Sequence, residues 1–244
     1  MFRVRQVFLL WGILAAAAWT SSTASPAFGR ELRPVDLRKF LRMDIKRVSA
    51  STACPEIVSR GLWGARPPKA RQDMATPVPF VILHHTFTYA CFTLQDCSKL
   101  MRSIQNFHMD DRGWNDIAYS FLVGEDGRVY EGRGWDTVGS HAPWYNFRSI
   151  GISIMGNFTA KLPNKKAISA VQSLISCAID KNKLNANYIL YGHRQATPDR
   201  TCPGEALFKE MQSWPHWQAG DHFPPMKTEN EPDDVFFEEK EDKP

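Results

Sequence analysis

His193 and Cys202, near the end of the chain, have the residue types of metal ligands. Eight residues separate them in the segment Gly-His-Arg-Gln-Ala-Thr-Pro-Asp-Arg-Thr-Cys-Pro-Gly. A third ligand is available in the pair His84-His85, which ends a run of apolar residues. Imidazole nitrogen and thiolate sulfur both bind zinc well, and three protein ligands with an open fourth position are typical of a catalytic zinc site.

The same residues are compatible with purely structural roles. The histidine pair lies more than 100 residues before His193, so spacing alone gives weak support for a shared site. Each histidine could be a hydrogen-bonded core or surface residue, and Cys202 could be a small buried hydrophobic residue or half of a disulfide. Successive side chains of a strand point to opposite faces, so the two adjacent histidines cannot face one site in the same way.

The chain has five cysteines, an odd number. Cys91 and Cys97 are close enough in sequence to close a small loop. Cys54 and Cys177 are candidate partners because a bridge between them would tie down the start of the domain. Four cysteines permit three pairings, so the connectivity stays open at this point. On this interpretation Cys202 is the unpaired thiol.

The composition favours one folded domain with additional segments. The 244 residues are 43% hydrophobic and 23% charged, which excludes a collagen, a coiled coil and a wholly disordered chain. The net charge of +4 is too small to indicate a dedicated nucleic-acid-binding protein.

The first residues have the pattern of a secretory signal peptide. Arg3 and Arg5 precede an apolar run that is shorter than the roughly 20 residues of a membrane span, and small residues follow it. A short buried helix or an uncleaved membrane anchor is the alternative. We expect a secreted protein without a membrane span in the mature chain, in an oxidising compartment where disulfides persist. The predicted parts are a signal peptide (1–24), a basic leader or linker (25–53), a folded domain (54–218) and a disordered acidic tail (219–244).

Strand and helix patterns alternate along the folded domain, which predicts an α/β sheet with helices packed on its faces. The apolar runs predict strands at 79–84, 150–155 and 188–191, and a hairpin formed by 119–123 and 128–131. Apolar residues at helical spacing predict helices at 95–109 and 167–178, and a last helix from Pro203 to Trp214.

Ordered motifs over residues 57–217 resemble the peptidoglycan recognition proteins, which are related to zinc-dependent N-acetylmuramoyl-L-alanine amidases of the phage lysozyme type. The motifs are Trp63-Gly-Ala, Val-Ile-Leu-His84-His85-Thr86, Arg112-Gly-Trp-Asn-Asp-Ile-Ala-Tyr119-Ser-Phe, Gly-Arg-Gly-Trp135, Gly-Ser-His141-Ala, Ser-Ile-Gly-Ile-Ser, Gly192-His193-Arg-Gln and Thr-Cys202-Pro-Gly. The resemblance implies a single domain with a central mixed β-sheet flanked by three main helices. It also implies the disulfides Cys91–Cys97 and Cys54–Cys177.

The resemblance further implies a Zn²⁺ site formed by His84, His193 and Cys202. Family members without amidase activity commonly replace this cysteine, so its presence implies a working enzyme that hydrolyses the lactyl–L-alanine amide of muramyl peptides. Tyr119 falls at the catalytic tyrosine position; its alternative role is a packed sheet residue. The loop before Cys202 is one residue longer than usual and has Arg200 two positions before the cysteine, so the supporting catalytic residue is Arg200 or Thr201.

Substrate contacts are also implied by the resemblance. The corresponding groove residues are His85, Thr86, His108, Arg112, Gly113, Trp114, Arg133, His141 and Asn146. The Gly113-Trp114 pair together with Arg133 implies a preference for diaminopimelate-type stem peptides, because an arginine can grip the additional carboxylate. The alternatives are a solvated hairpin charge for Arg133 and a core aromatic residue for Trp114.

Asn157-Phe-Thr is an N-glycosylation acceptor sequence, and an unmodified surface asparagine is the alternative. The expected function is a secreted zinc amidase that acts on bacterial peptidoglycan, in antibacterial innate immunity or in scavenging. Two other functions compete with it. One is a non-catalytic receptor that binds peptidoglycan and signals through a partner, and the other is thiol hydrolysis by Cys202 with His193, which we consider weaker because a metal-bound thiolate is not available as a nucleophile.

Overall fold

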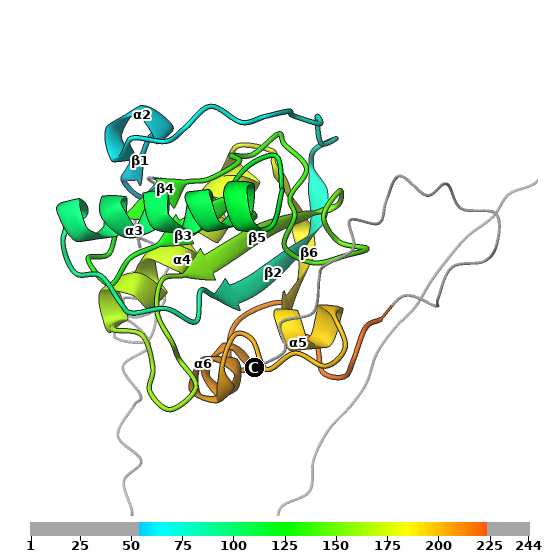
Figure 1. Ribbon diagram of the computed structural model, residues 1–244. Coiled ribbons are helices and arrows are strands. Elements are labelled where there is room, and N and C mark those ends of the chain that lie inside the picture. Colours follow the sequence, from blue (N-terminus) through cyan, green and yellow to red (C-terminus); the bar gives the residue numbers. More distant parts are fainter. Residues whose placement is uncertain (1–53, 224–244) are drawn as a thin grey trace, which may run out of the picture. The chain divides into compact units, whose positions relative to one another are not determined.

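The computed structural model describes residues 54–223 (Figure 1). The predicted signal peptide, the basic leader and residues 224–244 of the predicted tail lie outside the described residues. Within residues 54–223, no helix has both the length and the apolar character needed to cross a bilayer.

A mixed sheet of six strands forms the centre of the described domain, as expected. Its strands are β1 (Ile57–Val58), β2 (Val78–His85), β3 (Phe121–Val123), β4 (Val129–Glu131), β5 (Ser149–Ile154) and β6 (Leu184–Gly192). Their order is β1-β4-β3-β5-β2-β6. Strands β3 and β4 form the predicted antiparallel hairpin, and all other neighbouring strands are parallel.

Strand β2 lies between two parallel neighbours, and this position explains its continuous apolar sequence. Its residues pair with β5 on one side and β6 on the other. Val81, Ile82 and Leu83 are fully buried, because helices or loops cover both faces of the sheet here. The carboxyl ends of β2 and β6 therefore lie next to each other at one edge of the sheet, which is where parallel sheets commonly place a site.

Helices cover the two faces of the sheet (Figure 1). The helices are α2 (Arg60–Trp63), α3 (Leu94–Asn106), the π-helix η1 (Phe107–Asp111), α4 (Lys165–Asp180), α5 (His193–Ala196) and α6 (Glu205–Met211). Strand β3 separates two hydrophobic clusters: Leu122 packs in the cluster with α3, whereas Phe121 and Val123 pack in the cluster with α4 and α6. The predicted flanking by three main helices is confirmed.

Two helices begin with side-chain caps that the sequence supplies. The Thr93 hydroxyl accepts a hydrogen bond from the Asp96 backbone N–H at the start of α3. The Asn164 amide oxygen accepts one from the Ala167 N–H at the start of α4. Such caps satisfy backbone donors that the first turn leaves without partners.

The last helix begins two residues later than expected. We predicted a start at Pro203, but α6 begins at Glu205. Gly204 adopts a φ of 92°, far from helical values, so the helical turn can start only after it. The short helix α5 was not predicted from the sequence.

Both expected disulfides are present. Cys91–Cys97 closes the small loop before α3, and Cys54–Cys177 joins the first described residue to α4. Cys202 is the free cysteine in the described part of the chain.

Residues 217–222 follow α6 and form a C-terminal strap that is bound to α5. The amide nitrogen of Gln195 donates to the carbonyls of Gln218 and Gly220, both at 2.8 Å. Its amide oxygen accepts from the indole N–H of Trp217 and from the backbone N–H that precedes α5, both at 3.1 Å. All four hydrogen-bonding positions of this buried amide are therefore used.

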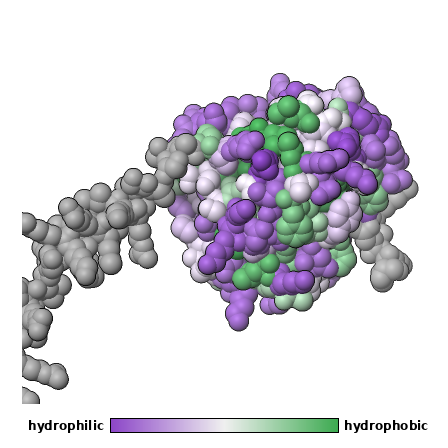
Figure 2. Space-filling view, turned by 90° about the vertical axis from the view of Figure 1, so that its left-hand side faces the viewer, coloured by the Kyte–Doolittle hydropathy of each residue, from purple (hydrophilic) through white to green (hydrophobic). Residues whose placement is uncertain are grey.

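The surface of the domain carries scattered apolar side chains. Figure 2 shows one face, on which apolar residues occur in small groups separated by hydrophilic ones. The most exposed large apolar residues are Leu62, Phe87, Tyr89 and Phe92. Isolated groups of this kind are ordinary on a folded domain.

Candidate active site and metal centre

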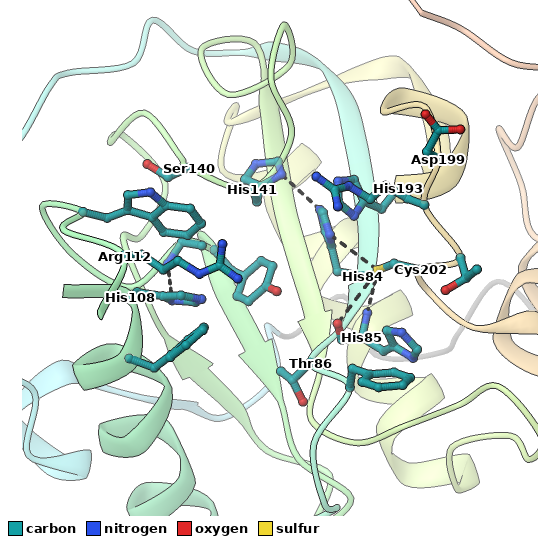
Figure 3. A pocket seen from close by; sticks show the side chains of 17 residues that line it. His84, His85, Thr86, His108, Arg112, Ser140, His141, His193, Asp199 and Cys202 are labelled. Atoms are coloured by element: carbon teal, nitrogen blue, oxygen red, sulfur yellow. Dashed lines mark hydrogen bonds between the residues drawn. The ribbon is translucent and has the colours of Figure 1, made fainter. Parts of the chain in front are cut away.

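Three potential metal ligands converge at the edge of the sheet formed by β2 and β6 (Figure 3). His84 lies at the carboxyl end of β2, His193 follows β6 as the first residue of α5, and Cys202 lies in the loop after α5. One ligand atom from each residue lies within 4.8 Å of the other two. Parallel pairing of β2 with β6 thus brings together residues that are distant in sequence.

The geometry of this cluster fits zinc. His84 Nδ1 lies 3.7 Å from Cys202 Sγ. Tetrahedral coordination at ordinary Zn–N and Zn–S bond lengths separates two such atoms by about 3.6 Å. In the described structure His193 Nε2 is buried without a hydrogen-bond partner, as expected of a nitrogen whose lone pair is kept for a metal. The donor set of two imidazoles and one thiol is the set that zinc accepts.

The side chain of His85 does not join the cluster. His84 lies on the same face of β2 as Ile82, and His85 lies on the opposite face, where its Nδ1 accepts a hydrogen bond from the Phe158 N–H at 3.2 Å. The backbone N–H of His85 still contributes, because it donates to Cys202 Sγ at 3.4 Å. Alternation along the strand thus directs the two side chains to opposite faces, and the structure places His84 in the cluster.

The surroundings favour neutral imidazoles. Burial, followed by repulsion from His193, holds the pKa of His84 well below its usual range. Burial, with repulsion from His141 and Arg200, lowers the pKa of His193 to about 3. Both rings therefore keep a lone pair for a metal at neutral pH.

For the thiol of Cys202, the surroundings disfavour the deprotonated form that binds a metal. Burial raises the pKa of Cys202 to about 12, although the hydrogen bond from the His85 backbone acts against this increase. A positive ion in the cluster reverses such a preference, because a coordinating thiol is deprotonated. A divalent metal ion would therefore stabilise the thiolate form of Cys202, which burial alone disfavours.

A pocket extends from the ligand cluster across the face of the sheet (Figure 3). It is lined by His84, His85, Thr86, Phe87, Phe107, His108, Arg112, Trp114, Ala118, Tyr119, Ser140, His141, His193, Asp199, Arg200, Thr201 and Cys202. The potential metal ligands His84, His193 and Cys202 lie on one side, and His108 and Arg112 lie on the other. The pocket thus combines the expected catalytic residues with most of the expected substrate-binding residues.

Tyr119 lies between the two sides. Its ring centroid is 5.1 Å from that of His84 and 5.9 Å from that of His108. The residue is partly buried and precedes β3, so it is not the fully packed sheet tyrosine that was the alternative. A phenol in this place can donate a proton to an oxygen atom near the metal ligands.

Three of the expected groove residues do not line the pocket. Arg133 lies behind the wall, where its guanidinium donates to the carbonyls of Ile117 and Val138 and to the Ser140 hydroxyl. It is therefore neither the solvated charge that was the alternative nor a pocket-lining cation. Burial lowers its pKa to about 10, while the nearby Asp116 acts in the opposite direction.

Gly113 and Asn146 are the other two residues outside the pocket lining. Gly113 is exposed and has a φ of 75° in the turn after η1. The Asn146 amide oxygen accepts hydrogen bonds from the backbone N–H groups of His141 and Ala142, at 2.7 and 2.9 Å. Asn146 thus holds the segment that carries His141.

Sequence reasoning missed several pocket residues. Phe107 and Phe87 form rims of the pocket, and Ser140 and Asp199 complete its walls. Ser140 and Phe87 are next to predicted site residues in the sequence, so proximity could have indicated them. Asp199 likewise precedes the candidate catalytic residue Arg200, and Phe107 precedes the expected groove residue His108.

The acceptor asparagine Asn157 is exposed in the loop after β5. Its side-chain oxygen accepts hydrogen bonds from the Thr159 N–H and hydroxyl, at 3.1 and 2.8 Å. The neighbouring Phe158 N–H contacts His85, so this loop borders the pocket.

Comparisons with known proteins agree with this geometry. A family model described as N-acetylmuramoyl-L-alanine amidase matches residues 74–205. Peptidoglycan-recognition protein LB of Drosophila melanogaster is 45% identical over 166 residues, which cover 68% of this chain and 71% of that protein. The N-acetylmuramoyl-L-alanine amidase of Homo sapiens is 46% identical over 175 residues, which cover 70% of this chain and 30% of that longer protein.

A solved structure adds a ligand to the comparison. Peptidoglycan recognition protein-LE in complex with tracheal cytotoxin, a monomeric diaminopimelic acid-type peptidoglycan, superposes with a TM-score of 0.65 and is 39% identical. The match covers 66% of this chain and 95% of the solved one. The sequence and the fold of this chain therefore both have counterparts in one family, and the chain belongs to the peptidoglycan recognition proteins.

Proposed function

Because this chain belongs to the peptidoglycan recognition protein family, we propose that it is a zinc-dependent N-acetylmuramoyl-L-alanine amidase, which hydrolyses the bond between the lactyl group of muramic acid and L-alanine. The observation that carries the proposal is the convergence of His84, His193 and Cys202 within 4.8 Å at the bottom of a pocket. The amidase named among the relatives supports it.

The three ligands would hold the zinc ion, which when bound supplies Lewis acidity and activates water at neutral pH. Tyr119 would donate its hydroxyl proton in a hydrogen bond to the oxyanion that develops on the amide carbonyl, or would orient the attacking water. Arg200 and Thr201 line the pocket directly before Cys202, and we assign them the supporting role at the reaction centre.

The opposite side of the pocket would bind the peptide stem. His108, Arg112 and Trp114 present aromatic surfaces and a cation to the cavity. Thr86, His85 and His141 complete the proposed contacts near the metal side. Sugar hydroxyls, amides and carboxylates of a muramyl peptide are matched by such a mixture of aromatic and cationic groups.

We assign a preference for diaminopimelate-type stems to the opposite side of the pocket, which is formed by His108, Arg112 and Trp114. Arg112 points into the cavity in Figure 3, and it is the cation best placed to grip the additional carboxylate. Arg133 would support the same wall indirectly, through its hydrogen bond to Ser140. The relative that was solved with diaminopimelic acid-type peptidoglycan supports this assignment.

The cellular setting follows from the disulfides and the first residues. Two disulfides favour a secreted protein, as does the signal-peptide pattern of residues 1–24. Exposure of Asn157 supports its glycosylation in that compartment. The protein would then meet bacterial cell-wall fragments outside the cell, in antibacterial defence or in scavenging.

The deciding experiment incubates the purified protein with diaminopimelate-type and lysine-type muramyl peptides, with and without a chelator. We expect free stem peptide from both, faster from the diaminopimelate type, and none after metal removal. Release that continues in the chelated protein would reject the metal mechanism. Binding without release by the zinc-loaded protein would identify a non-catalytic receptor instead.

A further inference from the structure

The metal ligand His84 contacts another histidine, His141, inside the pocket wall. His84 Nε2 lies 3.1 Å from His141 Nδ1. The two rings meet edge to face, with centroids 5.0 Å apart and planes at 83°. Figure 3 shows this contact on the side of His84 that faces away from Cys202.

If His84 binds a metal, the donor and the acceptor of its hydrogen bond with His141 are determined. His84 faces Cys202 Sγ with Nδ1, so Nδ1 must keep its lone pair for the metal and the ring proton must sit on Nε2. The Nε2–H group then donates to His141 Nδ1. A metal-bound histidine usually donates its other N–H to a carboxylate, a carbonyl or water, whereas here the acceptor is a second imidazole.

We propose that His141 is a positioning residue for the metal centre, which fixes the tautomer and the ring orientation of His84 by accepting its Nε2 proton in a hydrogen bond. This inference rests on the proposed zinc site. It gives His141 a role separate from any contact with substrate.

The ring of His141 is held in place by close packing. A Cβ atom on Gly151 would lie 2.4 Å from His141 Cδ2 and Nε2, and one on Gly139 would lie 2.5 Å from Cδ2. Non-bonded contacts of a Cβ atom this short essentially never occur, so both positions must remain glycine for this ring to fit. The space in the wall is therefore shaped to an imidazole.

The backbone of His141 is fixed independently of the ring. Its N–H donates to the Asn146 amide oxygen at 2.7 Å. The other ring nitrogen, His141 Nε2, is buried without a partner in the described structure. Packing and Asn146, rather than a second hydrogen bond to the ring, thus set the direction of His141 Nδ1.

His108 provides a matched control within the same pocket. It is also a buried, pocket-lining histidine, and it lies on the opposite side of Tyr119. Its Nδ1 accepts from the Ala118 N–H at 3.1 Å, and among the described residues its ring makes no hydrogen bond to His84, His193 or Cys202. Loss of its imidazole should therefore leave the metal centre unchanged.

The test compares zinc dissociation constants of the full-length protein and four variants by competition with a chromophoric chelator. His141→Asn keeps an acceptor at the Nδ1 position, and we expect an affinity within about 3-fold of wild type. His141→Gln carries its amide one bond too far, and we expect affinity to fall about 10- to 100-fold, the usual effect of losing such a partner. His108→Gln should be unchanged, and Asn146→Ala should weaken binding by a smaller factor than His141→Gln.

Cobalt substitution gives a readout that a general loss of stability would not produce. The visible absorption bands of the Co²⁺ form should change in His141→Gln and Asn146→Ala and stay as in wild type in His141→Asn and His108→Gln. Equal zinc affinity and equal spectra in wild type and His141→Gln would overturn the inference, as would an Asn variant as weak as the Gln variant. If His141→Gln does not fold, unchanged affinity and spectrum in Asn146→Ala would overturn it.

The same measurements separate this inference from the proposed function. Absence of zinc binding by the wild-type protein would reject both. Stoichiometric zinc in wild type and normal amide hydrolysis, with the His141 variants unchanged in affinity, would reject only the positioning role of His141.

Discussion

The two sides of the pocket are built in different ways. The metal side is formed at the carboxyl ends of two neighbouring parallel strands, β2 and the edge strand β6, together with the loop after α5. The imidazole of His84 is buried there. The opposite side comes from the π-helix η1 and the turn after it, where Phe107 is 45% exposed. The residues proposed to meet at one metal ion thus lie beside the central sheet, and the residues proposed to contact an extended ligand lie on the π-helix and the turn after it.

The π-helix explains how the second side reaches the pocket. Helix α3 does not end with a cap at Asn106 but continues into η1, and the Arg112 N–H donates to the Phe107 carbonyl five residues before it. This wider turn is uncommon and occurs often at functional sites. It places His108 inward, buried, while Arg112 remains partly exposed. A regular helix would distribute these side chains differently.

Removing one proposed metal ligand should cause the largest loss of hydrolysis. It should leave peptide binding by the opposite side of the pocket intact. In Cys202→Ser we expect hydrolysis to fall by at least about 10³-fold, because both water activation and carbonyl polarisation are lost. Binding of muramyl peptide, measured by calorimetry, should change by less than about 3-fold because the opposite side is intact. Loss of binding equal to the loss of turnover would show that the two sides do not act separately.

Tyr119 lies at the border of the two sides, and its hydroxyl is expected to matter only for the reaction. Tyr119→Phe should lower kcat by about 10²- to 10³-fold, the typical effect of losing one donor to an oxyanion. KM should stay nearly constant. Tyr188→Phe, which removes a hydroxyl outside the pocket, serves as the control. A change in KM without a change in kcat would assign Tyr119 to the binding side.

The opposite side should affect stem selectivity more than turnover. Arg112→Ala is expected to weaken binding of diaminopimelate-type peptides by about 10- to 100-fold, the range for hydrogen bonds to a charged group. Lysine-type peptides should lose much less. Lys99→Ala removes an exposed cation of α3 that does not line the pocket and should change neither. An equal loss for both peptide types would remove the assignment of Arg112 to the additional carboxylate.

His108 should give the smallest effect, in stability at acid pH. Burial, with Arg133 and Arg112 nearby, lowers its pKa to about 3, below the ordinary value of 6.5. Between these values the unfolded chain binds a proton that the folded protein does not, so stability falls as pH falls. In metal-free protein, His108→Gln should reduce the loss of unfolding free energy between pH 6.5 and pH 5 by about 1–2 kcal/mol. Urea denaturation at both pH values measures this difference, and identical losses in wild type and variant would show that His108 has the same pKa in the folded and unfolded states.

The sequence was sufficient for the parts of the molecule that follow from local patterns. Apolar runs located β2, β5 and β6, and helical spacing located α3 and α4, because burial of one face or of both faces leaves a clear periodicity. Strand alternation predicted that only one of His84 and His85 would face the cluster, although the choice of His84 came from the family resemblance. The short separation of Cys91 and Cys97 made them candidate partners, although the pairing itself was implied by the family resemblance.

Other features depend on tertiary contacts that no local pattern records. Arg133 was expected in the groove, but its guanidinium is taken up by backbone carbonyls of loops that only the folded chain brings around it. Asn146 was expected to touch substrate, yet it holds the backbone of His141. No hydrophobic periodicity in the sequence predicts the π-helical turn of η1. The same is true of the hydrogen bonds between Gln195 and the C-terminal strap.

The C-terminal strap also provides a spectroscopic probe of α5, the helix that carries His193. The indole N–H of Trp217 donates to the side-chain oxygen of Gln195, two residues after His193, the proposed metal ligand. The chemical shift of the Trp217 indole proton should therefore respond to changes in the hydrogen bond between the strap and α5. Metal loading or ligand entry can be followed at that signal without attaching a label to the protein.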